Sequence, residues 1–417
     1  MIYNFKFALT VMMRYKVLLI LFALCTLWTC IDPYTPKLTG YESLLVVESM
    51  ISDGNISNTV KLSRTIQDQN TSPVMVSDAN VSITDNNNTT TILQNQGKGI
   101  YKTDSSSFRG VVGRIYTLHI TTREGVEYES EPCIMQSAPD IDSVYFEKDQ
   151  ELFNNGTESQ DGIRIYLNSK AGYDQQYLGW AFVETWKFSV PYPKMFDYLG
   201  GGRVALTHDI KKYCWKTKVS DQVIIPSTFS GPDATIRRQP IFFIAPAKSD
   251  RLMLGYSILV KQYSISDREY EFWNNLKKVN ESGADIFASQ PFSVISNIRN
   301  INNPRERVLG FFQVSAEKQK RIFIPFEILA KMQLPFYHND QCVRIERDPS
   351  EYGSEFGPEV TFDELYSMFC IKSDYYFIEP MYSVESGLIE KLVFARPECA
   401  NCELTGTSSR PGFWIDL

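Results

Sequence analysis

The chain has 417 residues, of which 43% are hydrophobic, 22% charged and 13% aromatic. This composition excludes a disordered chain and favours a globular, β-rich protein of two or three domains. The formal net charge is −7 and the sequence has no long basic run, which excludes the electrostatic footprint of a nucleic-acid-binding protein.

The N-terminus has the layout of a bacterial signal peptide. Arg14 and Lys16 precede an uncharged apolar run from Val17 to Trp28, and Cys30 follows. Such a run is too short to span a bilayer, which needs about 20 residues. The segment "LWTC" resembles a lipobox, so we expect a signal peptide over 1–29, a lipid such as palmitate on Cys30 and a tether over 30–41. An ordinary cleaved signal, or an anchor helix with an unmodified Cys30, is the alternative.

Short strands separated by turn residues predict a first domain over 42–137. The clearest hairpin lies in "GVVGRIYTLHITTREGVEYESEP", where Tyr116, Leu118 and Ile120 point to one face and "REG" makes the turn. Further strands are expected in "SLLVVESMIS", "NTVKLSRT" and "VSDANVSITDNNNTTTILQ". Several short strands over about 100 residues are typical of an immunoglobulin-like β-sandwich.

The remaining residues, 138–417, predict a larger β-rich domain with at least one inserted α-helix. Its first strand is expected in "PDIDSVYFE", and "VLGFFQVSAEKQKRIFI" reads as another hairpin. The helix is expected near 267–281, with Ser266 or Asp267 as its N-cap and apolar residues at spacings of three and four. The fold class is therefore mainly β.

The aromatic strand "WAFVETWKFSV" has two interpretations. Trp180 and Trp186 share a face with Glu184, and stacked aromatic rings beside a carboxylate suit contact with a ligand or partner. The same face could instead be the inner wall of a sandwich, with Glu184 paired to an arginine. The following stretch "VPYPKMFDYLGGGR", with Tyr192 and Tyr198, is expected to be a protruding contact loop.

The cysteines are expected to form disulfides, because an exported protein meets an oxidising environment. Once Cys25 and Cys30 are set aside, six cysteines remain, at positions 133, 214, 342, 370, 399 and 402. Cys399 and Cys402 form a C-x-x-C without a second pair for structural zinc and without a following helix for a redox dithiol. The disulfide candidates are Cys399, Cys402, Cys214, Cys342 and Cys370, and the spacing does not choose the pairs.

Motifs for catalysis and for cofactors are missing from the sequence. His119, His208 and His338 lie far apart, so no H-E-x-x-H zinc motif is present, and there is no G-x-S-x-G elbow. The "LGGGRV" segment lacks the context of a phosphate-binding loop. We therefore expect no catalytic residues, no metal and no cofactor.

The mature chain resembles the DUF4249 family of Bacteroidota outer-membrane lipoproteins. The resemblance is carried by "ILVKQYSIS", "YEFWNNLKK" and the tail "CANCELTGTSSRPGFW". It departs from the family after the second cysteine of the tail, where "ELTGTSS" replaces the usual "RGG". The resemblance implies an outer-membrane lipoprotein of unknown function, often encoded beside a TonB-dependent receptor, and it carries over no catalytic residues.

We expect a non-enzymatic lipoprotein that is lipid-anchored in the cell outer membrane, on its periplasmic or extracellular face, and helps a TonB-dependent β-barrel receptor to capture or hand over its substrate. A structural, adhesion or envelope-assembly subunit is the first alternative. An extracellular hydrolase is the second.

Overall fold

The computed structural model describes residues 42–54, 57–66, 72–153, 156–170, 177–220, 223–225, 235–282, 294–335, 337–352 and 360–415. The chain forms two compact units, and the first comprises Met1–Ser43 with Thr65–Ser72. The expected signal peptide at 1–29, Cys30 and the tether at 30–41 lie outside the described residues. The second unit, Leu44–Arg64 with Pro73–Leu417, contains all the strands and helices given below.

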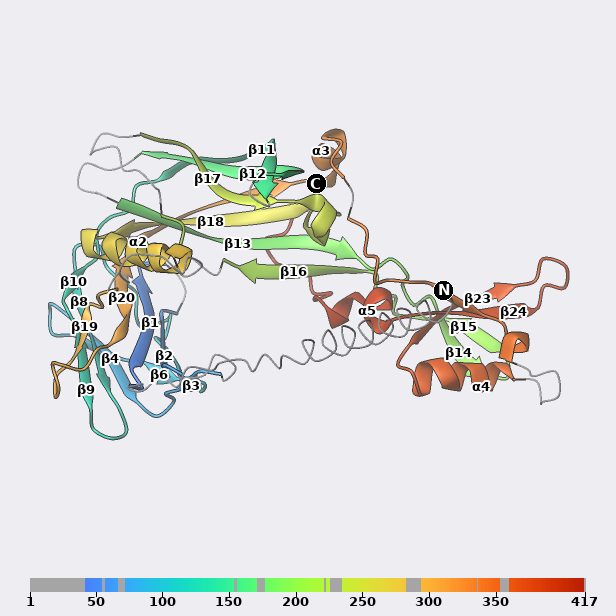
Figure 1. The fold of residues 1–417 in the computed structure, drawn as a ribbon, viewed down its shortest axis with the longest axis horizontal. Coiled ribbons are helices and arrows are strands. Elements are labelled where there is room, and N and C mark those ends of the chain that lie inside the picture. The colour runs from blue at the N-terminus through green and yellow to red at the C-terminus, as the bar shows by residue number, and fades with distance from the viewer. Residues whose placement is uncertain are drawn as a thin grey trace, which may run out of the picture. The chain divides into compact units, whose positions relative to one another are not determined.

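The fold is mainly β, with 48% of residues in strands and 14% in helices, as the composition predicts. An N-terminal β-sandwich comes first (Figure 1). One of its sheets has the order β20 (Leu309–Ser315), β1 (Leu45–Ser52), β2 (Thr59–Arg64), β7 (Ile100–Lys102), β6 (Gln94–Asn95), with β3 (Val74–Met75) beside β2. The other has the order β19 (Ile298–Asn300), β9 (Glu127–Ser130), β8 (Ile115–Thr121), β4 (Asn80–Asp85), β5 (Thr90–Ile92), with β10 (Cys133–Ile134) beside β8.

The sandwich core follows the predicted alternation of side chains. Tyr116, Leu118 and Ile120 on β8 are at most 1% exposed, and they pack against residues of the facing sheet such as Val47 and Leu62. Because successive strand residues point to opposite faces, this buries every second side chain.

The predicted boundary at residue 137 does not separate the strands of this sandwich. β19 pairs antiparallel with β9, and β20 pairs parallel with β1. Both strands come from residues 298–315, which the sequence analysis placed in the second domain. The chain returns to complete one edge of each sheet.

The predicted hairpin over 308–324 is also replaced by a crossover. β20 belongs to the N-terminal sandwich, whereas the next strand, β21 (Glu317–Ile324), pairs with β18 (Tyr256–Ile265) in another sheet. Only Ala316 lies between the two strands. The main-chain N–H of Glu317 donates to the Asp53 carboxylate at 2.7 Å, so the crossing is fastened to the loop after β1.

A second, central sandwich packs two sheets face to face, one layer of β11, β12 and β17 and one of β13, β16 and β18 (Figure 1). The first sheet has the order β11 (Ile141–Phe153), β12 (Glu158–Lys170), β17 (Thr235–Ile244). The second has the order β16 (Tyr213–Val219), β13 (Tyr177–Ser189), β18, β21. Their shared core includes Ile163, Ile165, Trp180 and Phe182.

The predicted helix is α2 (Asp267–Ser282). Ser266 caps it, because its Oγ accepts a hydrogen bond from the N–H of Glu269 at 3.2 Å. Phe272 on its buried face packs against Phe311 of β20, with 5.0 Å between ring centroids. The helix therefore lies against the sandwich strand that arrives from the far end of the sequence.

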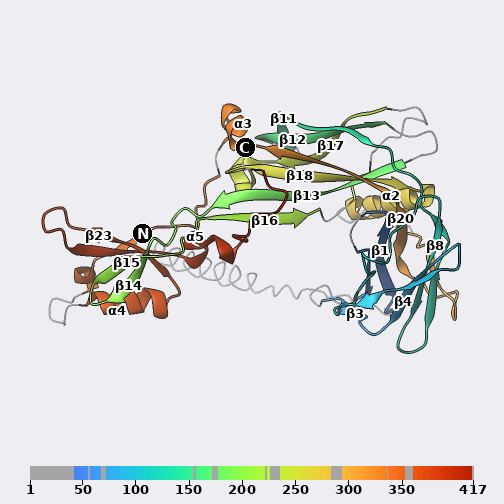
Figure 2. The same ribbon diagram turned by 180° about the vertical axis from the view of Figure 1, so that it is seen from behind.

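The C-terminal lobe combines small sheets and short helices. Its sheets are β14 (Phe196–Gly200) with β15 (Arg203–Leu206), and β22 (Ile345–Arg347), β24 (Ile389–Ala395), β23 (Tyr376–Tyr382) in that order. Figure 2 shows α4 (Phe362–Tyr366) beside β14 and β15, and the three elements share an aromatic cluster. The other short helices and helical turns that the structure describes are η1 (Pro246–Lys248), η2 (Asp250–Leu252), α3 (Phe326–Lys331), η3 (Pro349–Tyr352), η4 (Ser367–Ile371), α5 (Pro397–Ala400) and η5 (Cys402–Leu404); η3 and η4 contribute to the same aromatic cluster as α4.

Candidate functional site

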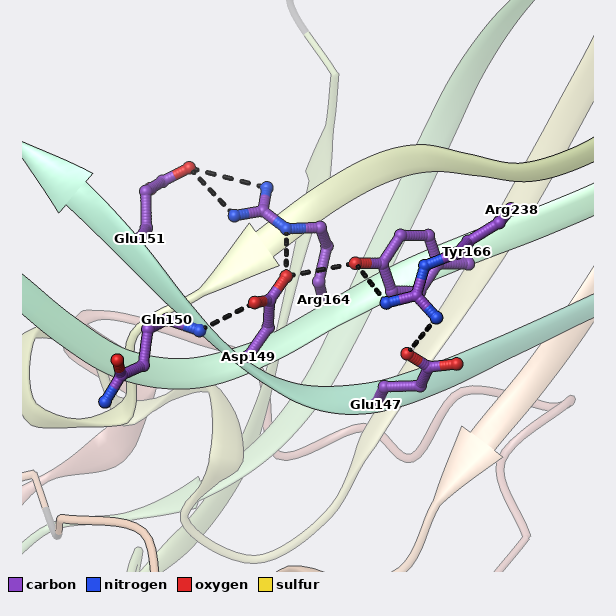
Figure 3. A network of polar contacts seen from close by, with 7 residues as sticks. All are labelled: Glu147, Asp149, Gln150, Glu151, Arg164, Tyr166 and Arg238. Atoms are coloured by element: carbon purple, nitrogen blue, oxygen red, sulfur yellow. Dashed lines mark hydrogen bonds and ion pairs between the residues drawn. The ribbon is translucent and has the colours of Figure 1, made fainter.

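The candidate site is a layer of charged and aromatic side chains on the outer face of β11, β12 and β17 (Figure 3). Glu147, Asp149 and Glu151 occupy alternate positions on β11, so they share a face, and Arg164 on β12 is the register partner of Glu147. The intervening β12 residues Ile163 and Ile165 are fully buried. Strand alternation therefore fixes which side chains reach this outer face.

Arg164 and Asp149 form the centre of the layer. Arg164 Nε donates to Asp149 Oδ2 at 2.6 Å, and the Tyr166 hydroxyl donates to the same oxygen at 3.0 Å. The N–H of Gln150 donates to Asp149 Oδ1 at 2.8 Å. The hydrogen bond from Arg164, followed by that from the Gln150 N–H, lowers the pKa of Asp149, so this carboxylate is ionised at neutral pH.

Arg238 covers the ring of Tyr166. Its guanidinium carbon lies 4.4 Å from the ring centroid, and its Nη1 forms an ion pair with Glu147 Oε2 at 2.6 Å. Tyr145 stacks on Tyr166 with 5.7 Å between ring centroids. Arg164 in turn lies 4.8 Å above the ring of Phe243 on β17. These contacts hold each aromatic ring and each guanidinium in a fixed orientation.

Asp149 does not have the properties of a general acid. General acid catalysis needs a carboxyl with a raised pKa, and glycoside hydrolysis needs one such acid beside a second carboxylate, whereas Asp149 has a lowered pKa. Tyrosine and arginine are the residue types that dominate protein interfaces. The side chains of Arg238 and Glu151 are 59% and 49% exposed, so a partner can reach them.

Trp180 and Trp186, the predicted contact residues on β13, lie in the central core. They are 0% and 6% exposed, and their indole N–H groups donate to Gln262 and Asp250, both at 2.9 Å. Glu184 on the same face is 1% exposed and pairs with Arg251 at 2.7 Å. The contact interpretation is therefore incorrect, and the inner-wall alternative describes this face.

Tyr192 and Tyr198 lie in the C-terminal lobe, where the expected protruding loop forms the β14–β15 hairpin. Tyr198 stacks on Tyr366 with 4.8 Å between ring centroids, and its hydroxyl donates to Asp363 at 2.8 Å. Asp363 also accepts the N–H of Gly201 at 2.9 Å. Both tyrosines are half-buried: Tyr198 lies under the glycine turn that folds back onto α4, and Tyr192 packs against a separate cluster that includes Cys342 and Cys399.

Four of the five disulfide candidates are bonded. Cys214 pairs with Cys402, and Cys342 pairs with Cys399, so the C-x-x-C clamps the tail to two separate parts of the fold. Cys370 is a free thiol, which corrects its place among the candidates, and Cys133 is free as well. Burial raises the pKa of both thiols to about 11. Cys30 lies outside the described residues.

Sequence reasoning missed the outer-face layer. The segment "EKDQE" places acids at alternate positions of a strand, which is a recognisable signal for a charged face. Arg238 could not be found this way, because the pairing of β12 with β17 shifts register twice, between Ile165 and Tyr166 and between Leu167 and Ser169. These irregularities decide where Arg238 lies.

Within the described ranges, no group of three or more His, Cys, Asp or Glu side chains could hold a metal ion. None of the helices in those ranges is long and apolar enough to cross a membrane.

A family model described as a domain of unknown function (DUF4249) matches residues 31–321. This match spans the tether, the N-terminal sandwich and most of the central sandwich. Comparisons with curated proteins and with solved structures give no match.

Proposed function

Since this chain belongs to the DUF4249 family, a family of unknown function, we propose that it is a non-enzymatic lipoprotein of the outer membrane that assists a TonB-dependent transporter. Cys30 carries the lipid anchor, and the outer face of β11, β12 and β17 docks on the transporter during capture or handover of its substrate. The docking surface is inferred from the preorganised layer of Arg164, Tyr166 and Arg238.

Export is supported by the two disulfides. Cys214 and Cys402 are 188 residues apart, and Cys342 and Cys399 are 57 apart. Such bonds persist in the periplasm and on cell surfaces, and they are rare where thiols are kept reduced. The lipobox-like "LWTC" supports anchoring, and a diacylated cysteine would supply the two chains that stable membrane attachment requires.

A binding role is supported by the chemistry of the outer face. Each arginine in the layer already neutralises a carboxylate and covers an aromatic ring. A partner therefore meets side chains that lose little conformational entropy on binding. Tyr166 is 6% exposed, so a partner would contact the guanidinium above it first.

The test is co-purification of the full-length protein from its native outer membrane after mild detergent extraction. We expect a β-barrel transporter to accompany it, and a deletion strain to grow poorly on the nutrient which that transporter imports. Recovery of the protein without any barrel partner would contradict the proposal. A deletion strain with defective attachment and normal growth on defined nutrients would favour the adhesion alternative.

A further inference from the structure

A cavity of about 320 Å³ lies where the N-terminal sandwich meets the first turn of α2. The walls come from the β9–β10 connection, from β10 and β20, and from the start of α2. Phe311 of β20, which also packs against Phe272 of α2, provides an apolar wall. A volume of this size matches the lower end of pockets that hold small ligands.

Glu269 is the buried acidic side chain of this cavity. It is 3% exposed, and within the described part of the chain its carboxylate has no ion pair. Burial raises the pKa of Glu269, and this rise is partly offset by the indole N–H of Trp273, the main-chain N–H of Ser266 and the hydroxyl of Ser315; the Trp273 and Ser315 groups have no hydrogen-bond partner among the residues that the structure describes. The ionised form of this buried carboxyl lacks a counter-charge and is costly, so a cation in the cavity would stabilise it.

The charges around Glu269 favour a cation over an anion. Glu131, Asp267 and Glu269 are the acidic residues of the lining, and Arg268 is its one base. Arg268 is already paired with Glu131. The positive end of the α2 dipole would attract an anion, but Asp267 and Glu269 occupy the first turn. The other titratable group of the lining is Cys133, whose pKa is raised to about 11 by burial, so it stays neutral.

We propose that this cavity binds a small organic ammonium ion, with the Glu269 carboxylate as its counter-charge and with Phe311 against its alkyl part. Phenylalanine faces add to the attraction of a cation. The site lies apart from the outer face of β11, β12 and β17, and it does not depend on the proposed transporter.

Binding is coupled to the release of a proton. Burial raises the pKa of Glu269 to about 8, so the carboxyl carries a proton at pH 7 when no counter-charge is present. An ammonium ion stabilises the ionised form, and the proton passes to the buffer. Close to one proton should leave per bound ligand at pH 7, and affinity should rise as the pH approaches 8.

The experiment is isothermal titration calorimetry of the purified protein at pH 7 in two buffers of different ionisation enthalpy. The probes are n-butylammonium chloride, n-butanol and sodium butyrate, which share one alkyl chain and differ in charge. We expect only butylammonium to bind, with proton release. The variant Glu269→Gln should bind it at least tenfold more weakly. Glu271→Gln, an exposed position on the same helix, is the matched control and should bind normally.

Several results would overturn the proposal. Equal binding of butanol would show that the cavity selects only for an apolar ligand. Stronger binding of butyrate would show an anion site at the helix N-terminus, and absence of binding by all three probes would show that the cavity is not a site for these ligands. Unchanged binding by a folded Glu269→Gln protein would show that this carboxylate is not the counter-charge of the ligand. The comparison of probes uses the natural chain alone, so it decides the proposal even if that variant does not fold.

Discussion

Arg251 holds the carboxylate of Glu184 with two hydrogen bonds, of 2.7 Å from Nε and 2.8 Å from Nη2. Glu184 is 1% exposed, and the Tyr256 hydroxyl donates a third hydrogen bond to it at 3.1 Å. The pair joins β13 to the helical turn η2 inside the central sandwich.

Replacing Arg251 with Met should lower the free energy of unfolding by about 3–5 kcal/mol, because Glu184 would be left as an unpaired buried charge. Urea denaturation measures this loss. As a control, Lys61→Ala removes the pair with Glu48, whose side chains are 39% and 59% exposed, and should cost about 1 kcal/mol or less. An equal loss in both variants would show that the buried pair contributes no more to stability than the exposed pair.

Peptide mapping without reduction should recover Cys214 joined to Cys402 and Cys342 joined to Cys399. Cys133 and Cys370 should react slowly with iodoacetamide at pH 8 in the folded protein, because their pKa of about 11 keeps the thiolate scarce. The variant Cys402→Ser should lose about 2–5 kcal/mol of stability. Rapid labelling of Cys399 in the native protein would contradict this pairing.

The free energy of unfolding should fall as the pH rises towards the pKa of Glu269. Its pKa is about 8 in the folded chain and 4.5 ordinarily, so the folded state retains a proton that the unfolded state has lost. The resulting stabilisation is complete below pH 4.5 and is lost by about pH 8. The loss is at most roughly 5 kcal/mol.

Urea midpoints measured from pH 5 to pH 8 test this effect of Glu269. Glu269→Gln, which cannot ionise, should flatten the decline, whereas the exposed control Glu271→Gln should follow the natural chain. A decline of equal size in Glu269→Gln would assign the effect to another group.

Arg238→Ala should weaken co-purification with the proposed transporter by tenfold or more, since it uncovers Tyr166 and frees Glu147. Stability should change by less than about 1 kcal/mol, because the arginine is 59% exposed. The matched control is Arg299→Ala, an arginine 70% exposed that pairs with Glu129 on the N-terminal sandwich. Equal effects of both variants on recovery would argue against a specific docking face.

Gly310→Ala should detach β20 from β1. Gly310 has φ of 92°, and a Cβ atom there would overlap the backbone of Val47. We expect a loss of more than about 3 kcal/mol in thermal or urea unfolding. Gly113 has a similar φ of 87° and open space around it, so Gly113→Ala should cost only about 1 kcal/mol. Equal losses would mean that backbone strain alone decides the cost.

Local features of this fold were predictable from the sequence. The alternation of Tyr116, Leu118 and Ile120 predicted β8, and an N-cap at Ser266 or Asp267 with apolar residues at spacings of three and four predicted α2. The strand at Trp180 was also clear, but alternation marks a face without saying what covers it. The opposite sheet, which buries this face, is made of β11, β12 and β17, and the sequence pattern does not show that these strands stack on β13.

The pairing of distant segments was not predictable. The stretch around Ala316 has the pattern of two adjacent strands, and nothing in that pattern tells a hairpin from a crossover between sheets. The composition of the candidate docking face was not predictable for the same reason, because Arg238 reaches Tyr166 only through the bulged register of β12 and β17. The cysteine partners likewise depend on the three-dimensional path of the tail.

The parallel pairing of β1 with β20 also sets an order of events during folding. Synthesis delivers Leu45–Ser52 long before Leu309–Ser315, so the first strand waits with one edge unpaired until the later strand has been made. Unpaired strand edges recruit other chains into aggregates, and pairings this distant form slowly. A fragment that stops at residue 137 should therefore aggregate, because it lacks both return strands.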